Sequence, residues 1–131
     1  MKKIEVVAAV ISFGEKILCV QRPVNKLSYI SEKFEFPGGK IENSESRKEA
    51  LQRELIEELN ITPEIEELFL TVIHSYPDFE LTMHSFKCKV DSTYITLNEH
   101  ISFKWLRKYE LKNLDWAAAD IPIVDKLMND A

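Results

Sequence analysis

The residues in this sequence that point most directly to chemistry are three glutamates, Glu54, Glu57 and Glu58. Successive residues of a helix turn by about 100°, so positions i, i+3 and i+4 share one face. Crowded carboxylates repel one another, and they offer the oxygen ligands that Mg²⁺ or Mn²⁺ prefers. The alternative is an ordinary solvated helix face rich in glutamate. Whether these glutamates form a cation site therefore depends on the residues around them in the sequence.

A glycine pair precedes these acids, in Gly38-Gly39-Lys40. Glycine lets the backbone approach a ligand closely, so its peptide groups could supply a metal ligand or contact phosphate. Lys40 adds a positive charge beside them. A glycine pair alone is usually only a turn, but its place one loop ahead of the acids predicts that both belong to one site.

A helix over residues 46–59 must carry the glutamates. Ser46 is its predicted N-cap, and Glu49 completes a capping box three residues later. Asn60 follows the last turn, where it tolerates the left-handed conformation. An apolar stripe lies about a quarter-turn from the acids, so the helix can pack on a core while the acids face a cleft. The stripe consists of Leu51, Leu55 and Leu59.

The rest of the chain alternates short apolar runs with polar turns. Gly14 marks the turn of a hairpin between the first two strands, residues 25–33 form a polar loop, and Pro37-Gly38-Gly39 stops the third strand. A helical turn is expected at 111–114 and a closing helix at 121–128. The order predicts an α+β fold or an α/β sandwich. Strands are expected over residues 4–11, 16–20, 34–36, 68–74, 81–90 and 101–106.

Composition limits the class of protein. The 131 residues suit one domain over 1–131, and 45% hydrophobic content is ordinary for a folded chain. The 22 acidic and 17 basic residues give a net charge of −5, which argues against a nucleic acid polymer as partner. A nucleotide remains possible as a ligand, because a bound divalent metal can neutralise the negative charge of its phosphates. No apolar run approaches the ~20 residues of a membrane helix. Cys19 and Cys88 are expected to be buried free thiols and not a disulfide. Free thiols are typical of a reducing compartment, so we expect a cytoplasmic protein.

The spacing of the glycines and acids resembles the Nudix box. Five residues separate Gly39 from Glu45, and seven more precede Arg53. Asn60 departs from the family, which usually has Gly there; we expect a small stability cost and no loss of chemistry. The resemblance to the MutT-type branch covers essentially the whole chain. It rests on Arg53-Glu54-Leu55, Glu57-Glu58, Ile61, the leading hairpin, Phe34 to Lys40, Trp105 and Ala119-Asp120-Ile121-Pro122.

The resemblance implies an α/β/α sandwich, in which a mixed sheet carries the Nudix-box helix and a C-terminal helix. It also implies hydrolysis of a nucleoside triphosphate to a monophosphate and pyrophosphate, through in-line attack by water. Arg53 would orient Glu54, and Glu45 would be structural. Mg²⁺, with Mn²⁺ as a substitute, would be bound by Glu54, Glu57, Glu58 and the Gly38 carbonyl.

Two further residues complete the implied catalytic group. Glu99, six residues before Trp105, is expected as an additional metal ligand or as the general base, for which Glu54 and Glu57 are alternatives. Arg22, at the end of the second strand, is a candidate phosphate clamp, and a surface arginine is its alternative. His100 could titrate near neutrality, although a loop histidine is more often only solvated.

Asp120 is the candidate for reading the base. An ionised carboxylate only accepts hydrogen bonds, from the cytosine amino group or the guanine edge; capping the helix at 121–128 is its alternative role, and both could coexist. Phe36, Tyr76 and Phe79 could stack on the base or belong to the core. The Ala-Asp-Ile-Pro string resembles members acting on CTP, dCTP or 5-methyl-dCTP. The alternatives are 8-oxo-dGTP and a non-catalytic binding module, and we expect a monomer or homodimer.

Overall fold

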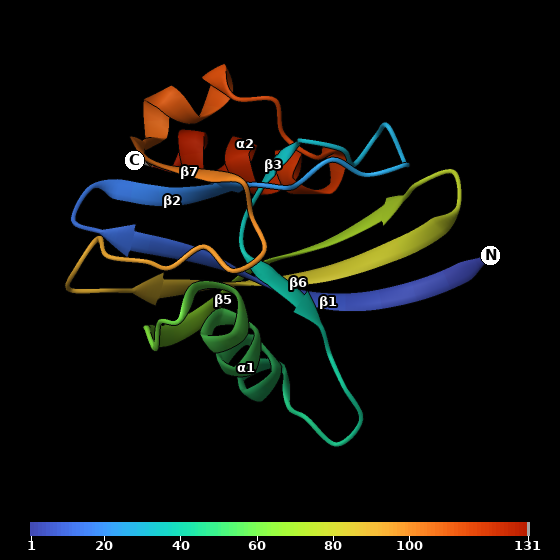
Figure 1. Ribbon diagram of the computed structural model, residues 1–131, viewed down its shortest axis with the longest axis horizontal. Helices are drawn as coiled ribbons and strands as arrows, with labels where there is room; N and C mark the ends of the chain where they lie inside the picture. The colour runs from blue at the N-terminus through green and yellow to red at the C-terminus, as the bar shows by residue number, and fades with distance from the viewer. Residues whose placement is uncertain (131) are drawn as a thin grey trace.

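A seven-stranded mixed sheet forms the middle layer of the computed structural model, which describes residues 1–130 (Figure 1). The strands follow the order β3-β2-β1-β6-β5, with β4 also paired to β1 and β7 to β2. The pairing of β1 with β6 is parallel and the others are antiparallel. The strands are β1 (Lys2–Phe13), β2 (Lys16–Gln21), β3 (Phe34–Glu35), β4 (Gly38–Lys40), β5 (Glu64–Ser75), β6 (Phe79–Lys89) and β7 (Ser102–Arg107).

Helices cover both faces of this sheet. Helix α1 (Arg47–Leu59) packs on one face and α2 (Ile121–Asn129) on the other (Figure 1). Two 3-10 helices, η1 (Lys108–Asn113) and η2 (Ala118–Asp120), lead into α2. Each face has its own buried cluster, one around Leu51 and Leu55 of α1 and one around Ile123 and Leu127 of α2. The predicted α/β/α sandwich is therefore confirmed. None of the helices formed by residues 1–130 is long and apolar enough to cross a membrane.

The ends of α1 follow the predicted signals. The Ser46 hydroxyl accepts from the Glu49 N–H at 3.1 Å, and the Glu49 carboxylate accepts from the Ser46 N–H at 2.8 Å. Asn60 takes the left-handed conformation with φ 54°. Leu51, Leu55 and Leu59 are fully buried, so the leucine stripe fixes which face of α1 turns to the sheet.

The glycine segment is a strand, not the turn expected from its composition. Residues Gly38–Lys40 form β4 and pair with β1, so that Gly38 lies opposite Ala8 and Gly39 opposite Val7. A Cβ on Gly38 would lie 1.9 Å from the Val7 carbonyl oxygen, which no side chain tolerates. The missing side chain therefore permits the close pairing that brings this segment under α1.

Other elements agree with expectation in kind and differ in length. The hairpin of β1 and β2 turns at Gly14, whose φ is +58°. Strands β1 and β5 extend beyond the predicted bounds, and η1 overlaps the helical turn expected at 111–114 but begins earlier and ends at Asn113. Cys19 and Cys88 are free and buried as predicted, and burial raises the pKa of each thiol to about 12.

Candidate active site

The three glutamates of α1 have different surroundings. Glu58 is buried, and the Glu54 side chain is 16% exposed, whereas the Glu57 side chain is 54% exposed. Glu58 accepts from the Gly38 N–H at 3.2 Å, and Glu54 lies against the backbone of Gly39. Helix α1 and strand β4 therefore hold the carboxylates of Glu54 and Glu58 beside the glycine pair.

Arg53 links Glu54 to the loop that precedes α1. Its Nε and Nη2 donate to both oxygens of Glu45, at 2.6 and 2.9 Å, and Nη2 also donates to the Lys40 carbonyl. Its Nη1 donates to Glu54 at 2.9 Å. Hydrogen bonding to Arg53, and then to the Glu42 N–H, lowers the pKa of Glu45. The planar guanidinium thus binds both oxygens of Glu45 with its fork while Nη1 holds Glu54, a set of bonds that lysine could not reproduce.

Glu58 is the most perturbed of the acids on α1. Burial first, then its hydrogen bond with Glu99, and then the charges of Glu35 and Glu54 raise its pKa to about 9. Burial also raises the pKa of Glu54, although Arg53 opposes the shift. Carboxyl groups gathered in a partly desolvated place repel one another, so a cation bound among them would relieve that repulsion.

The arrangement is not yet a closed metal site. Within residues 1–130, no three His, Cys, Asp or Glu side chains already form a group that could hold a metal ion. Glu57 instead turns toward Arg53, with contacts of 3.3 and 3.4 Å at the surface. An exposed ion pair of this kind contributes about 0–1 kcal/mol, so a rotation of Glu57 toward Glu54 and Glu58 costs little. The donor set fits Mg²⁺, which prefers carboxylate and carbonyl oxygens.

The loop before β7 brings Glu99 to the same place. Glu99 lines a small cleft with Arg22, Glu35, Glu58 and His100, and it is close enough to Glu58 to raise the pKa of that carboxyl. His100 is not the solvated loop residue that the sequence favoured. Its side chain is 3% exposed, with Nε2 3.0 Å from a carboxylate oxygen of Glu35. Because an ionised carboxylate only accepts, the imidazole is the donor.

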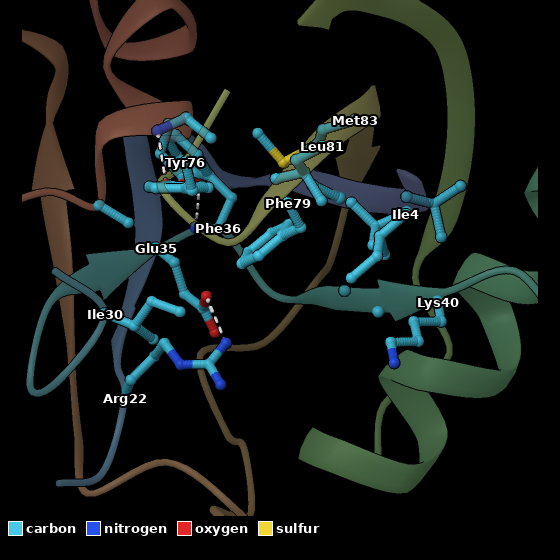
Figure 2. Close-up of a pocket in the computed structure, with 18 of the residues that line it drawn as sticks. Ile4, Arg22, Ile30, Glu35, Phe36, Lys40, Tyr76, Phe79, Leu81 and Met83 are labelled. Carbon is cyan, nitrogen blue, oxygen red and sulfur yellow. Dashed lines mark hydrogen bonds and ion pairs between the residues drawn. The ribbon is translucent and has the colours of Figure 1, made fainter. Parts of the chain in front are cut away.

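A cavity of about 260 Å³ adjoins the acids (Figure 2). Arg22 and Glu35 form an ion pair of 3.2 Å at one side, and Lys40 lies at the other. Glu58 lines the cavity as well, so the cavity and the acidic group are continuous. Its apolar wall includes Ile4, Val6, Phe79, Leu81 and Met83.

Asp120 lies in the wall of this cavity, fully buried, and its Oδ1 accepts from the Phe36 N–H at 3.0 Å. It makes no side-chain capping bond to α2, so the predicted capping alternative is wrong. Burial, and then the charge of Glu35, raises its pKa well above the usual value. A carboxyl group that retains its proton can donate a hydrogen bond as well as accept one. In that state Asp120 could also bond to acceptor atoms of a base, whereas the sequence predicted that it only accepts.

The three candidate aromatic residues differ in how freely they face the cavity. Phe36 is stacked on Trp116 with centroids 4.8 Å apart, and Tyr76 is stacked on Tyr29 at 5.2 Å. The Tyr76 hydroxyl also accepts from the Ala119 N–H. These contacts place Phe36 and Tyr76 in the core around the cavity. Phe79 is only partly buried, and its ring faces the cavity (Figure 2).

Sequence reasoning missed Glu35, which joins Arg22 and His100 and lines both hollows. The available signal was an acid between two phenylalanines, Phe34 and Phe36, in an otherwise apolar strand. A charge in such a position needs partners or a ligand.

Comparison with known proteins agrees with this geometry. The family profile of the NUDIX domain matches residues 1–127. The CTP pyrophosphohydrolase of Escherichia coli K12 is 36% identical over 98% of this chain and 93% of its own. The 8-oxo-dGTP diphosphatase of the same organism is 30% identical over 97% and 98%. The solution structure of a MutT protein of the Nudix hydrolase family, from methicillin-resistant Staphylococcus aureus 252, has 39% identity and a TM-score of 0.77, with 100% of both chains covered.

The chain therefore belongs to the Nudix family. It is a hydrolase of the pyrophosphohydrolase type, within a family that acts on nucleotides and generally uses a divalent metal such as Mg²⁺.

Proposed function

We propose that the protein hydrolyses nucleoside triphosphates to the monophosphate and pyrophosphate with Mg²⁺, and that cytidine-type triphosphates are preferred. The observation that carries this proposal is the continuity of two features. Glu58 lines a cavity that also contains Asp120 and, with Glu54 and Glu99, belongs to the acidic group. A base can therefore lie near Asp120 while its phosphates reach the acids.

The metal would be held by Glu54, Glu57, Glu58 and Glu99, with the Gly38 carbonyl beside them. A bound Mg²⁺ supplies neutralisation of phosphate charge and lowers the pKa of the attacking water. Glu99, or else Glu54 or Glu57, accepts the proton of that water as its oxygen bonds to phosphorus. The phosphorus–oxygen bond to pyrophosphate breaks, and the leaving group departs with the electron pair.

Positive groups near the cavity bind the phosphates. Arg22 is already held by Glu35 at 3.2 Å, so its guanidinium is oriented before a substrate enters. Lys40 is exposed at the opposite side and acts as a point charge (Figure 2). Gly39 lines the cavity and leaves room for the Glu54 carboxylate beside it, and Phe36 shapes the base pocket from the core.

Base preference is the finer part of the proposal. The 36% identity to a CTP pyrophosphohydrolase over nearly the whole chain favours cytosine, whose amino hydrogens Asp120 can accept. The second candidate is 8-oxo-dGTP, supported by the 30% identical diphosphatase. A proton retained on Asp120 would allow it to donate to a purine edge as well.

The test is a comparison of kcat/KM for CTP, dCTP, 5-methyl-dCTP, dGTP and 8-oxo-dGTP with Mg²⁺. The proposal predicts that a cytidine nucleotide has the highest value. A clear preference for 8-oxo-dGTP would move the assignment to the second candidate. No turnover of any of them would favour a binding module and contradict the proposal.

A further inference from the structure

Glu99 lies in a loop without regular structure. Residues 90–101 connect β6 to β7 and contain no helix or strand. A side chain on such a loop ordinarily samples many positions, and ordering it costs conformational entropy. Yet Glu99, although exposed, lines the same cleft as Glu58, and contacts on either side of it hold the loop in this place.

On one side of Glu99 the loop is fastened to the end of α1. The Asn98 side-chain amide donates to the Glu57 carbonyl at 2.8 Å, and the Asn98 N–H donates to the Glu58 carbonyl at 3.1 Å. The Thr96 N–H donates to the Leu59 carbonyl at 3.0 Å. The last carbonyls of a helix have no partner within it, so the loop satisfies groups that would otherwise need water.

On the other side the loop is fastened to the sheet. His100 is buried, with Nε2 3.0 Å from Glu35 of β3, and the Ile101 N–H donates to the Gln21 carbonyl of β2 at 3.0 Å. Glu35 is held in turn by Arg22. The residues on either side of Glu99 thus bind two different elements of the scaffold.

We propose that Asn98 and His100 are positioning residues that hold Glu99 against the helix acids, an inference that rests on the proposed role of Glu99. Asn98 attaches the loop to the turn of α1 that carries Glu57 and Glu58. The separation between loop acid and helix acids is therefore fixed before a metal binds. Preorganised ligands of this kind bind more tightly than the same ligands on a mobile loop.

The test uses Asn98→Ala, because Asn98 is at the surface and its loss leaves the core intact. Ser92→Ala is the matched control: Ser92 belongs to the same loop, and its hydroxyl accepts from the Tyr94 N–H at 3.1 Å, also at the surface. Binding of Mn²⁺ to the substrate-free protein is measured by the electron paramagnetic resonance signal of the free ion. Removal of a residue that orients a metal ligand typically weakens binding about 10–100-fold.

We expect Asn98→Ala to weaken Mn²⁺ binding about tenfold at the lower end of that range, and Ser92→Ala to leave it unchanged. His100→Gln keeps a donor near the position of Nε2 and should bind more tightly than His100→Ala. Thermal melts show whether each variant is folded at the temperature of the titration.

Glu99→Gln, alone and with Asn98→Ala, separates the possible failures. If Asn98 acts through Glu99, the double variant binds Mn²⁺ no more weakly than Glu99→Gln alone. Weakening by Glu99→Gln with no effect of Asn98→Ala, or with additive effects, overturns the inference and leaves the proposed function in place. Unchanged binding in Glu99→Gln overturns Glu99 as a metal ligand, and the inference with it.

Discussion

The backbone of Gly39 lies directly against the carboxylate of Glu54. A Cβ on Gly39 would be 2.3 Å from the Glu54 carboxyl carbon and 2.4 Å from Oε2. The Glu54 carboxylate therefore occupies the space that a side chain at position 39 would need. Since Arg53 donates to the other oxygen of Glu54, this carboxylate is held between a bare backbone and a guanidinium.

Gly39→Ala should displace Glu54 and weaken Mg²⁺ binding. Because the end of a side chain can move, we expect the fold to survive with a loss of about 1–3 kcal/mol, as is typical of overpacking. Titration calorimetry with Mg²⁺ measures the effect on the site. Gly14→Asn is the control, since Gly14 has open space around it and asparagine tolerates its positive φ. Equal Mg²⁺ affinity in both variants would refute the displacement.

Arg53→Lys should lower Mg²⁺-dependent turnover about 10–100-fold, as expected when the partner of a metal ligand is lost. A lysine ammonium cannot bind both oxygens of Glu45 and also reach Glu54. The measurement is the Mg²⁺ concentration for half-maximal activity, taken together with the melting temperature. A lower melting temperature with unchanged Mg²⁺ dependence would make Arg53 purely structural.

Asp120→Ala should reduce discrimination between bases, and it should also destabilise the protein by about 1–3 kcal/mol, because the buried Phe36 N–H loses its acceptor. Asp120→Asn retains an acceptor for Phe36 but adds an amide donor. We therefore expect it to fold normally and to change the ratio of kcat/KM for CTP to that for dGTP. An equal loss for every nucleotide would limit Asp120 to its bond with Phe36.

Cys19 and Cys88 should resist thiol reagents in the folded protein. Burial holds both pKa values near about 12, so little thiolate exists at pH 8. The unfolded chain releases these protons from pH about 9, whereas the folded chain retains them to about 12. Stability from this source is therefore lost as the pH rises through that window. Labelling with a chromogenic disulfide checks the prediction; modification without denaturant would contradict it.

The local features of the fold were predictable from sequence, and the contacts across the sheet were not. Ser46, Glu49 and the leucine stripe define α1 because caps and periodicity act over a few residues. By contrast, Arg22 directly follows β2, Glu35 lies in β3 and His100 lies in the 90–101 loop, and no spacing in the sequence predicts that these three side chains meet. This is why Glu35 was missed and His100 was expected in solvent.

Asp120 illustrates the same limit. Asp120 directly precedes α2 and so stands at its N-cap position, but its side chain accepts from the Phe36 N–H instead of capping the helix. Leaving the buried Phe36 N–H without an acceptor would cost more free energy than losing the cap of α2, because water can bond to the end of the helix instead. The strand β4 was hidden for a related reason, since glycine usually signals a turn and here permits close pairing with β1.

Mg²⁺-dependent hydrolysis of CTP to CMP and pyrophosphate is tested most directly by ³¹P NMR of CTP incubated with the protein, with Mg²⁺ and then with excess chelator. We expect CMP and pyrophosphate in equal amounts with Mg²⁺, no reaction with chelator, and strongly reduced turnover in Glu57→Gln. Release of inorganic phosphate, or pyrophosphate formation that persists with chelator and in Glu57→Gln, would contradict it.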